Sequence, residues 1–345
     1  MKYKILGRSG LRVSELSLGA MTFGEETGMG STAAVARQIY DRYRELGGNF
    51  IDTANIYTHG TSERMLAEFL ATERSQVVLA SKYSMTTQPG DPNGSGNHRK
   101  NMVQALEASL RRLDTEYLDI YWVHGWDGLT RIDEVMRALD DQVRLGKILH
   151  IGASNMPAWL ISQANTLAAE RCWTPFTALQ LHYNLVERSI EADFFDLATS
   201  QDMAITAWSP LAGGLLTGKF NRAADPDKAV NARLKSAPYG AAMLAEHRLN
   251  IAEGLTELAK TIGCDPAQLA LAWLMHRPQG SVIPIIGARS MAQFENNLEC
   301  LNLGLNQTQI EELDALNPPP PVYPASLFKT DFYRAMMHGE KRIVD

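Results

Sequence analysis

Short apolar runs alternate with longer amphipathic stretches along most of the chain. Apolar runs bounded by turn residues indicate buried strands, and apolar residues spaced three and four apart indicate the helices that cover them. The pattern predicts strands at residues 15–20, 50–52, 77–82, 118–124, 148–153, 178–181, 204–208 and 282–286. Strands that alternate with helices in this way predict an α/β fold, a (β/α)8 TIM barrel of parallel strands.

Capping residues and glycines mark the ends of the expected helices. Ser31 and Thr32 precede the first helix, and Gly47 and Gly48 end it. The pattern predicts helices at residues 32–46, 62–70, 99–113, 132–145, 157–169, 189–199, 249–261, 266–276, 290–298 and 307–316.

Two segments lie outside the repeating units. Residues 2–6 and 11–13 flank a Gly-Arg-Ser-Gly turn and predict a β-hairpin, which we expect to form a lid ahead of the barrel. Near the other end, the prolines at 318–321 redirect the chain, and the C-terminal tail is expected to lie over the barrel mouth. No linker divides the chain, so residues 1–345 are expected to form a single domain.

Nearly every predicted strand ends in a polar or aromatic residue. Active sites of (β/α)8 barrels lie at the carboxyl ends of the strands, so these residues are the candidates for chemistry. They are Thr22, Asp52, Lys82, His124, Ser154, Asn155, Gln180, Trp208, Ser209, Gly287 and Arg289.

A proton donor can be assembled from four of the residues near the strand ends. Tyr57 has an unperturbed pKa of about 10, which a nearby ammonium lowers, so Lys82 is its natural partner. Asp52 would keep Lys82 charged, and His124 would orient a substrate oxygen. Such a set suits carbonyl reduction, for which a bound nicotinamide must supply the hydride.

The remaining strand ends predict where this nicotinamide binds. Ser154, Asn155 and Gln180 can hydrogen-bond a carboxamide, and Trp208 offers a flat face for stacking. Gly287 precedes the last barrel helix, whose amino end is suited to an anion. Arg289 and Lys219 add positive charge for a phosphate, which favours NADPH over NADH.

The motifs that carry these residues resemble those of the aldo-keto reductases, and they occur in the family's order. They are D-T-A-N-I-Y at 52–57, A-S-K-Y at 80–83, D-I-Y-W-V-H at 119–124, I-G-A-S-N at 151–155, A-W-S-P-L at 207–211 and I-I-G-A-R at 285–289. Residues 90–102 are similar to the aryl-alcohol-dehydrogenase-like branch.

The resemblance implies roles for individual residues. It implies a catalytic tetrad of Asp52, Tyr57, Lys82 and His124, and nicotinamide contacts at Ser154, Asn155, Gln180 and Trp208. It implies adenosine-phosphate contacts at Arg289, Gln293, Asn296 and Asn297, with Lys219 beside them. Further candidate contacts to NADP(H) are Thr22, Asp52, Ser209, Pro210, Leu211, Gly213 and Gly287.

The substrate is expected to be an aromatic or otherwise bulky apolar carbonyl compound. Phe23, Tyr83 and Trp126 follow strand ends and are as well suited to line a pocket as to pack in the core. They join Tyr57 and His124 as candidate substrate contacts, and the tail adds Phe332, Tyr333 and Met336. The sequence predicts neither the physiological substrate nor the oligomeric state.

Composition narrows the function further. The formal net charge is −6 with no basic stripe, which argues against nucleic-acid partners. No apolar run approaches the roughly 20 residues that span a bilayer, and no signal peptide is evident. Three scattered cysteines indicate a reducing cytoplasm. The other histidines, His182 among them, lack metal-ligand spacing and are interpreted as surface or structural residues.

Two alternatives remain open. Residues 28–33 fit G-x-G-x-x-A, a pattern of Rossmann dehydrogenases, although that motif normally follows a strand directly. The second alternative is a non-catalytic NADP(H) sensor or regulatory subunit, which the intact set of four catalytic residues argues against.

Overall fold

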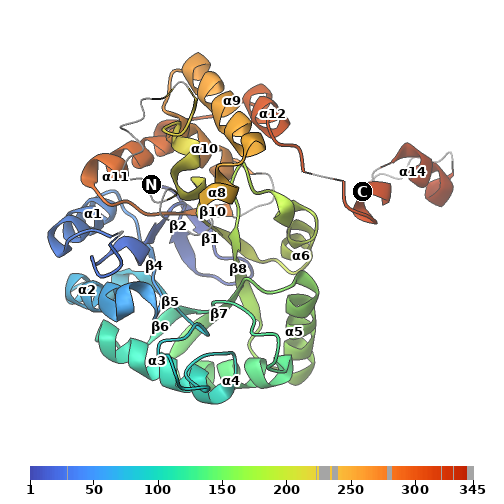
Figure 1. Ribbon diagram of the computed structural model, residues 1–345. Coiled ribbons are helices and arrows are strands. Elements are labelled where there is room, and N and C mark those ends of the chain that lie inside the picture. Colours follow the sequence, from blue (N-terminus) through green and yellow to red (C-terminus); the bar gives the residue numbers. More distant parts are fainter. Residues whose placement is uncertain are drawn as a thin grey trace.

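A closed barrel of parallel strands forms the centre of the molecule (Figure 1). The computed structural model describes residues 1–28, 30–222, 224, 234, 240–277, 282–319, 321–328 and 330–339. The strands pair in the order β10-β3-β4-β5-β6-β7-β8-β9, which confirms the predicted (β/α)8 barrel. They are β3 (Ser17–Gly19), β4 (Phe50–Asp52), β5 (Val78–Tyr83), β6 (Leu118–Val123), β7 (Ile148–Ser154), β8 (Phe176–His182), β9 (Ala204–Trp208) and β10 (Val282–Ile286).

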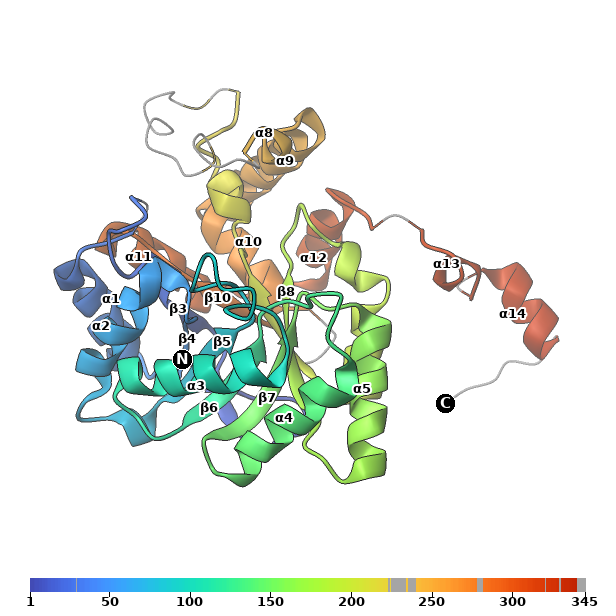
Figure 2. The ribbon, with the colours of Figure 1, turned by 60° about the horizontal axis from the view of Figure 1, so that its bottom comes forward.

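Helices surround this barrel (Figures 1 and 2), and their buried apolar residues belong to the same cluster as residues of the strands. The Thr32 side chain caps the first helix, and Asp265 with Gln268 forms a capping box at the start of helix α10 (Pro266–Met275). The helices are α1 (Ala33–Glu45), α2 (Thr61–Leu70), α3 (Arg99–Leu113), α4 (Ile132–Arg144), α5 (Ala158–Arg171), α6 (Phe194–Ser200), α8 (Gly240–Met243), α9 (Glu246–Ile262), α10 (Pro266–Met275), α11 (Met291–Leu298) and α12 (Gln307–Ala315). Short 3-10 segments are η1 (Ala20–Thr22), η2 (Tyr57–Gly60), η3 (Arg74–Gln76), η4 (Ser189–Glu191), η5 (Ala212–Thr217) and η7 (Glu299–Asn302).

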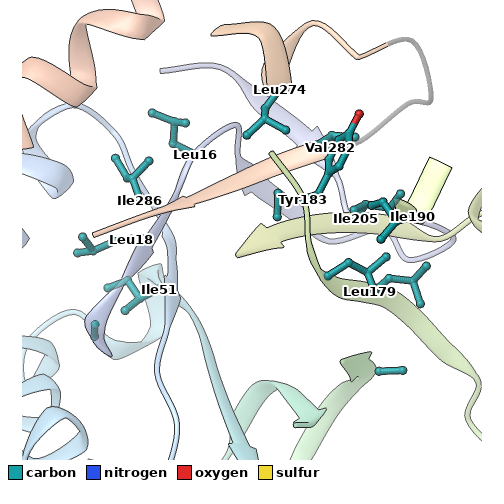
Figure 3. Packing of buried hydrophobic residues seen from close by; sticks show 14 of the residues in the cluster. Leu16, Leu18, Ile51, Leu179, Tyr183, Ile190, Ile205, Leu274, Val282 and Ile286 are labelled. Carbon is teal, nitrogen blue, oxygen red and sulfur yellow. The ribbon is translucent and has the colours of Figure 1, made fainter. Parts of the chain in front are cut away.

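Alternate residues of each strand face two separate apolar layers. One layer lies between strands and helices, and Figure 3 shows Leu18, Ile51 and Ile286 of three neighbouring strands close together in it. The other layer fills the barrel with smaller and larger side chains, including Phe50 and Trp122. The large Trp122 ring fits because its neighbour Gly152 has no side chain: an added Cβ there would lie 2.2 Å from the ring.

This alternation determines which polar residues enter the barrel. Side chains two residues apart point to the same face of a strand. Phe50 is therefore followed on the inner face by Asp52, and Ala80 by Lys82, at the carboxyl ends of β4 and β5. On β8, Ala178 is likewise followed by Gln180.

The N-terminal hairpin closes the end of the barrel opposite these polar residues. Strands β1 (Tyr3–Ile5) and β2 (Arg12–Ser14) form the predicted antiparallel pair. Leu6 and Val13 pack into the inner apolar layer, and Lys4 Nζ donates to the Val282 carbonyl at 2.7 Å, where β10 begins. The hairpin is therefore a lid on the amino ends of the strands.

The C-terminal tail does not lie over the barrel mouth in its described residues. Helices α13 (Ala325–Phe328) and α14 (Asp331–His338) extend away from the barrel (Figures 1 and 2). Of the tail side chains predicted to contact substrate, Phe332 is 70% and Met336 is 68% exposed, while Tyr333 is partly exposed and packs on Phe328 of the same tail. Pro318 and Pro319 lie shortly after the end of α12 at Ala315, where proline cannot continue a helix.

The closed barrel also excludes the Rossmann alternative, because a doubly wound fold has an open sheet. Met29 of the G-x-G-x-x-A stretch lies outside the described residues. No helix in the described part of the chain is long and apolar enough to cross a membrane.

Candidate active site

Asp52, Tyr57, Lys82 and His124 meet at the carboxyl ends of β4, β5 and β6. The Lys82 ammonium forms an ion pair with Asp52 and donates to the Tyr57 hydroxyl at 3.1 Å. It also donates to the Thr53 carbonyl at 2.7 Å, which satisfies the third N–H bond of the ammonium. The predicted tetrad is thus assembled around one lysine.

His124 completes the group from the next strand. Its main-chain amide donates to the Tyr83 carbonyl at 3.0 Å, which fixes the position of the residue just beyond β6. Its ring stands edge-on to that of Tyr57, with centroids 6.1 Å apart and planes at 85°. The two side chains can therefore approach one substrate oxygen from different directions.

Lys82 is fully buried yet remains charged. Burial by itself opposes the ammonium, but the Asp52 carboxylate and the Tyr57 phenol raise the Lys82 pKa above its ordinary value. A permanent positive charge therefore lies 3.1 Å from the Tyr57 hydroxyl.

The expectation that the Tyr57 pKa is lowered is corrected by the structure. Burial raises the pKa of Tyr57 and outweighs the lowering effect of Lys82, while the Asp52 charge adds a further increase. The sequence indicated the lysine contact but gave no measure of the desolvation that opposes it. Tyr57 is consequently a protonated phenol at neutral pH, in the state needed to donate a proton.

His124 is neutral under the same conditions. Burial, with a smaller contribution from Lys82, lowers the pKa of His124 to about 3. Its Nδ1 atom is buried and has no hydrogen-bond partner among the described residues. A neutral imidazole carries one N–H, so His124 can donate a single hydrogen bond to a substrate oxygen.

The predicted nicotinamide contacts are connected to this group. Gln180 Nε2 donates to Asp52 Oδ1 at 2.8 Å, and Gln180 lies opposite Ser154 in the register of β7 and β8. Asn155 Nδ2 donates to the His124 carbonyl at 2.8 Å and to Ser154 Oγ at 3.0 Å. These contacts orient the amide groups and leave Gln180 Oε1 and the exposed Asn155 available to a carboxamide.

Trp208 is stacked on a residue that the sequence analysis interpreted as structural. The His182 ring lies parallel to the indole, with centroids 4.1 Å apart and planes at 8°. His182 follows Gln180 by two positions on β8, so the alternation of that strand could have placed it at the site. The Trp208 Nε1 atom is buried without a partner in the described structure.

The loop after Trp208 bends sharply through left-handed conformations. Ser209 has φ of 55° and Gly213 has φ of 66°, and the Gly213 amide donates to Ser209 Oγ at 3.2 Å. The Lys219 ammonium lies against Gly214, where an added Cβ would be 2.7 Å from Nζ. Pro210 is buried and Leu211 is partly exposed. This loop brings backbone amides and one ammonium together next to β9.

The candidate phosphate residues lie where β10 leads into α11. Thr22 Oγ1 donates to the Ala288 carbonyl at 2.9 Å, which joins η1 to this loop beside the exposed Gly287. The Arg289 amide donates to Gln293 Oε1 at 3.1 Å, and Ser290 caps the helix.

Two asparagines farther along α11 differ in surroundings. Asn296 accepts from Gln268 at 2.9 Å and is partly exposed. Asn297 is only 5% exposed and faces the protein interior.

Two of the predicted substrate contacts are part of the core. Phe23 and Tyr83 have no exposed surface; Phe23 packs on Phe69, and Tyr83 stacks on Tyr121 at 5.3 Å. The packing alternative therefore holds for both, since a residue with no accessible surface cannot contact a substrate in this conformation. Loop residues next to a strand end face inward or outward according to long-range packing, which the local pattern does not specify.

Trp126 remains a candidate wall. It is partly exposed, and its ring meets Trp159 of α5 edge-on at 6.1 Å. Among the described residues, no cluster of histidine, cysteine and carboxylate side chains could hold a metal ion.

Comparison with known proteins agrees with this geometry. The aldo/keto reductase family model matches residues 15–318. The chain belongs to the aldo/keto reductase family. Norsolorinic acid reductase of Aspergillus flavus is 36% identical over 92% of this chain and 81% of its own length. Aryl-alcohol dehydrogenase [NADP(+)] of Phanerodontia chrysosporium is 34% identical over 92% of this chain and 86% of its own length. The uncharacterized oxidoreductase YrpG of Bacillus subtilis is 35% identical over 93% of this chain and 97% of its own length. Membership of this family identifies the protein as an oxidoreductase.

Proposed function

We propose that this aldo/keto reductase uses NADPH to reduce the carbonyl group of aromatic or bulky apolar aldehydes and ketones to alcohols. The observation that carries the proposal is the 3.1 Å contact between the Tyr57 hydroxyl and the charged Lys82, beside a neutral His124. This combination is a protonated donor next to a cation that can stabilise the phenolate left behind.

Each residue of the tetrad has a distinct task in the proposed reaction. Bound NADPH would supply the hydride, which side chains cannot provide. Tyr57 donates its proton to the carbonyl oxygen as negative charge develops there. Lys82 stabilises the resulting phenolate, and Asp52 holds Lys82 in place and charged. His124 donates its N–H bond to the same oxygen and so orients the carbonyl.

The residues at the strand ends fit a nicotinamide cofactor. Ser154, Asn155 and Gln180 present hydroxyl and amide groups on adjoining strands, which suits a carboxamide with both donors and acceptors. Trp208 would support the ring, with His182 stacked on the indole. The hydrogen bond between Gln180 and Asp52 supports a nicotinamide position next to the tetrad.

The proposed preference for NADPH over NADH rests on the loop between β10 and α11. Arg289 precedes α11, and its guanidinium is suited to a 2′-phosphate that NADH lacks. The name of the Phanerodontia relative includes NADP(+), which supports the same choice. An aromatic substrate is supported by the partly exposed Trp126 and by that relative's name, aryl-alcohol dehydrogenase.

We also propose a cytoplasmic location, which the free thiols of Cys172, Cys264 and Cys300 support.

A fluorescence titration with NADPH, followed by addition of aromatic and aliphatic aldehydes and ketones, tests the proposal. Binding of NADPH with its oxidation by an aromatic carbonyl is the expected result. The Tyr57→Phe protein is the matched control, because it keeps the ring and loses the hydroxyl. Tight binding without turnover across the panel would favour the sensor alternative, and failure to bind NADPH would refute the cofactor assignment.

A further inference from the structure

The backbone directly after Tyr57 passes through three left-handed residues in succession. Thr58 has φ 44° and ψ 44°, His59 has φ 52° and ψ 36°, and Gly60 has φ 86°. Glycine adopts this conformation freely, but a β-branched residue does so only at a cost. A strained threonine next to the proton donor therefore requires surroundings that hold it there.

The Thr58 side chain supplies that hold. Its hydroxyl donates to the Phe23 carbonyl at 2.7 Å and accepts from the Ser62 amide at 3.1 Å. The residue is 2% exposed, and its carbonyl accepts from the Thr61 amide. Glycine would meet the backbone requirement without strain, so the hydroxyl is what threonine adds at this position.

These hydrogen bonds belong to a closed circuit that returns to the tetrad. Ser62 Oγ is hydrogen-bonded to Thr53 Oγ1 at 2.8 Å, and the Thr53 carbonyl accepts from Lys82 at 2.7 Å. Lys82 in turn donates to the Tyr57 hydroxyl, and Tyr57 is covalently joined to Thr58. The circuit fixes both ends of Tyr57: its hydroxyl through Lys82 and its backbone through Thr58.

We propose that Thr58 is a positioning residue whose hydroxyl holds the Tyr57 backbone, and thereby keeps the phenol hydroxyl on the Lys82 ammonium. The proposal rests on the proposed function insofar as it concerns turnover. Without the hydroxyl, the strained turn relaxes and the phenol moves away from Lys82. Misplacement of a reacting group by about 1 Å can lower the rate on the order of 100-fold.

Thr58→Val tests the proposal, because valine keeps the branched shape and removes both hydrogen bonds. We expect kcat to fall about 10- to 100-fold, with an unchanged dissociation constant for NADPH. Thr58→Ser keeps the hydroxyl and should restore kcat. In the Tyr57→Phe background, Thr58→Val should lower the residual rate no further, because both changes act through the same phenol.

Thr177→Val is the matched control. Thr177 is a buried threonine at the start of β8, and its hydroxyl donates to the Ile151 carbonyl at 3.2 Å. Both valine variants lose a buried hydroxyl and should melt at a lower temperature than wild type, but only Thr58→Val should lose turnover. Equal kcat values for the two variants would overturn the proposal.

Crystal structures of ligand-free wild type and Thr58→Val provide a test that does not depend on activity. We expect the variant to lose the contact between the Tyr57 hydroxyl and Lys82 Nζ, and a retained contact would overturn the proposal. If none of the carbonyl compounds tested causes wild type to oxidise NADPH, the proposed function fails. The crystallographic comparison then decides the role of Thr58 on its own.

Discussion

Replacing Asp52 with asparagine would leave the Lys82 ammonium buried without its counter-charge. Lys82 has no exposed surface and Asp52 is 2% exposed, so water cannot compensate for the lost carboxylate. Removing one partner of a buried ion pair costs about 3–5 kcal/mol of folding free energy. Lys82 can instead release its proton, which from an ordinary pKa of 10.5 costs about 4.8 kcal/mol at pH 7. Release of the proton therefore sets an upper limit of about 4.8 kcal/mol on the loss, which lies within the first range.

This loss converts into a measurable change in melting temperature. With an unfolding entropy of about 2.1 cal/mol/K per residue, a chain of 345 residues has about 0.7 kcal/mol/K. Asp52→Asn should accordingly lower the melting temperature by about 4 to 7 °C at pH 7. Circular dichroism during heating provides the measurement.

The dependence on pH gives the prediction a distinctive sign. In wild type the Lys82 pKa is raised, so its stabilisation is complete below pH 10.5 and is lost as the pH rises through the folded-state pKa. In Asp52→Asn, burial would lower the Lys82 pKa of the folded chain. Between that pKa and about pH 10, the unfolded chain would then bind more protons than the folded chain. The variant should then gain stability from pH 7 towards about pH 10, and its deficit relative to wild type should narrow.

Asp41→Asn is the matched control for this measurement. Asp41 pairs with Arg37 at 2.8 Å on the surface of α1, where both side chains are about half exposed. An exposed pair contributes about 0–1 kcal/mol, so this variant should remain close to wild type at every pH. The reasoning is refuted if Asp52→Asn loses no more stability than Asp41→Asn, or if its deficit does not narrow with rising pH.

Four further predictions concern single residues. Tyr57→Phe should lower kcat by about 10²- to 10⁴-fold while the NADPH dissociation constant from fluorescence titration stays unchanged; equal loss of both would contradict the division of roles. Because the pKa of His124 is depressed, the free energy of unfolding of wild type should fall by about 1.4 kcal/mol per pH unit as the pH falls from 6.5 towards 3. Urea unfolding of His124→Asn should show a smaller decrease over the same pH range. Arg289→Ala should weaken NADPH binding about 10-fold or more and leave NADH binding unchanged, and an unaltered ratio of the two dissociation constants would remove Arg289 from the phosphate site. His182→Ala should weaken binding of both cofactors several-fold, because a stacked pair contributes about 0.5–1.5 kcal/mol to the orientation of Trp208, and titration of the variant with each cofactor would show it.

Local patterns were sufficient to predict the barrel and its polar strand ends. The predicted strands at 50–52, 204–208 and 282–286 and the helix at 99–113 agree with the structure at both ends. Alternation along a strand is a property of the backbone, so the residues that follow a buried run enter the same interior. This is why the four catalytic candidates, although distant in sequence, could be expected to meet.

Properties that depend on distant packing could not be predicted in the same way. Phe23 and Tyr83 lie near strand ends like the tetrad residues, but contacts with Phe69 and Tyr121 bury them. The Tyr57 pKa depends on a balance between burial and charge, and the sequence identifies only the charge. The prolines after α12 predict that the helix ends there, but a local pattern does not specify the direction that the tail then takes.

The pairing of β10 with β3 has a consequence for synthesis of the chain. Ser17 is the register partner of Ile285, which the ribosome adds 268 residues later (from 17 to 285). At about 5–20 residues per second, one edge of β3 waits roughly 13 to 54 seconds for its partner, exposed to pairing with other chains. The contact between Thr22 and Ala288 forms across the same seam. The nascent protein therefore joins η1 to the loop before α11 only at the moment of ring closure.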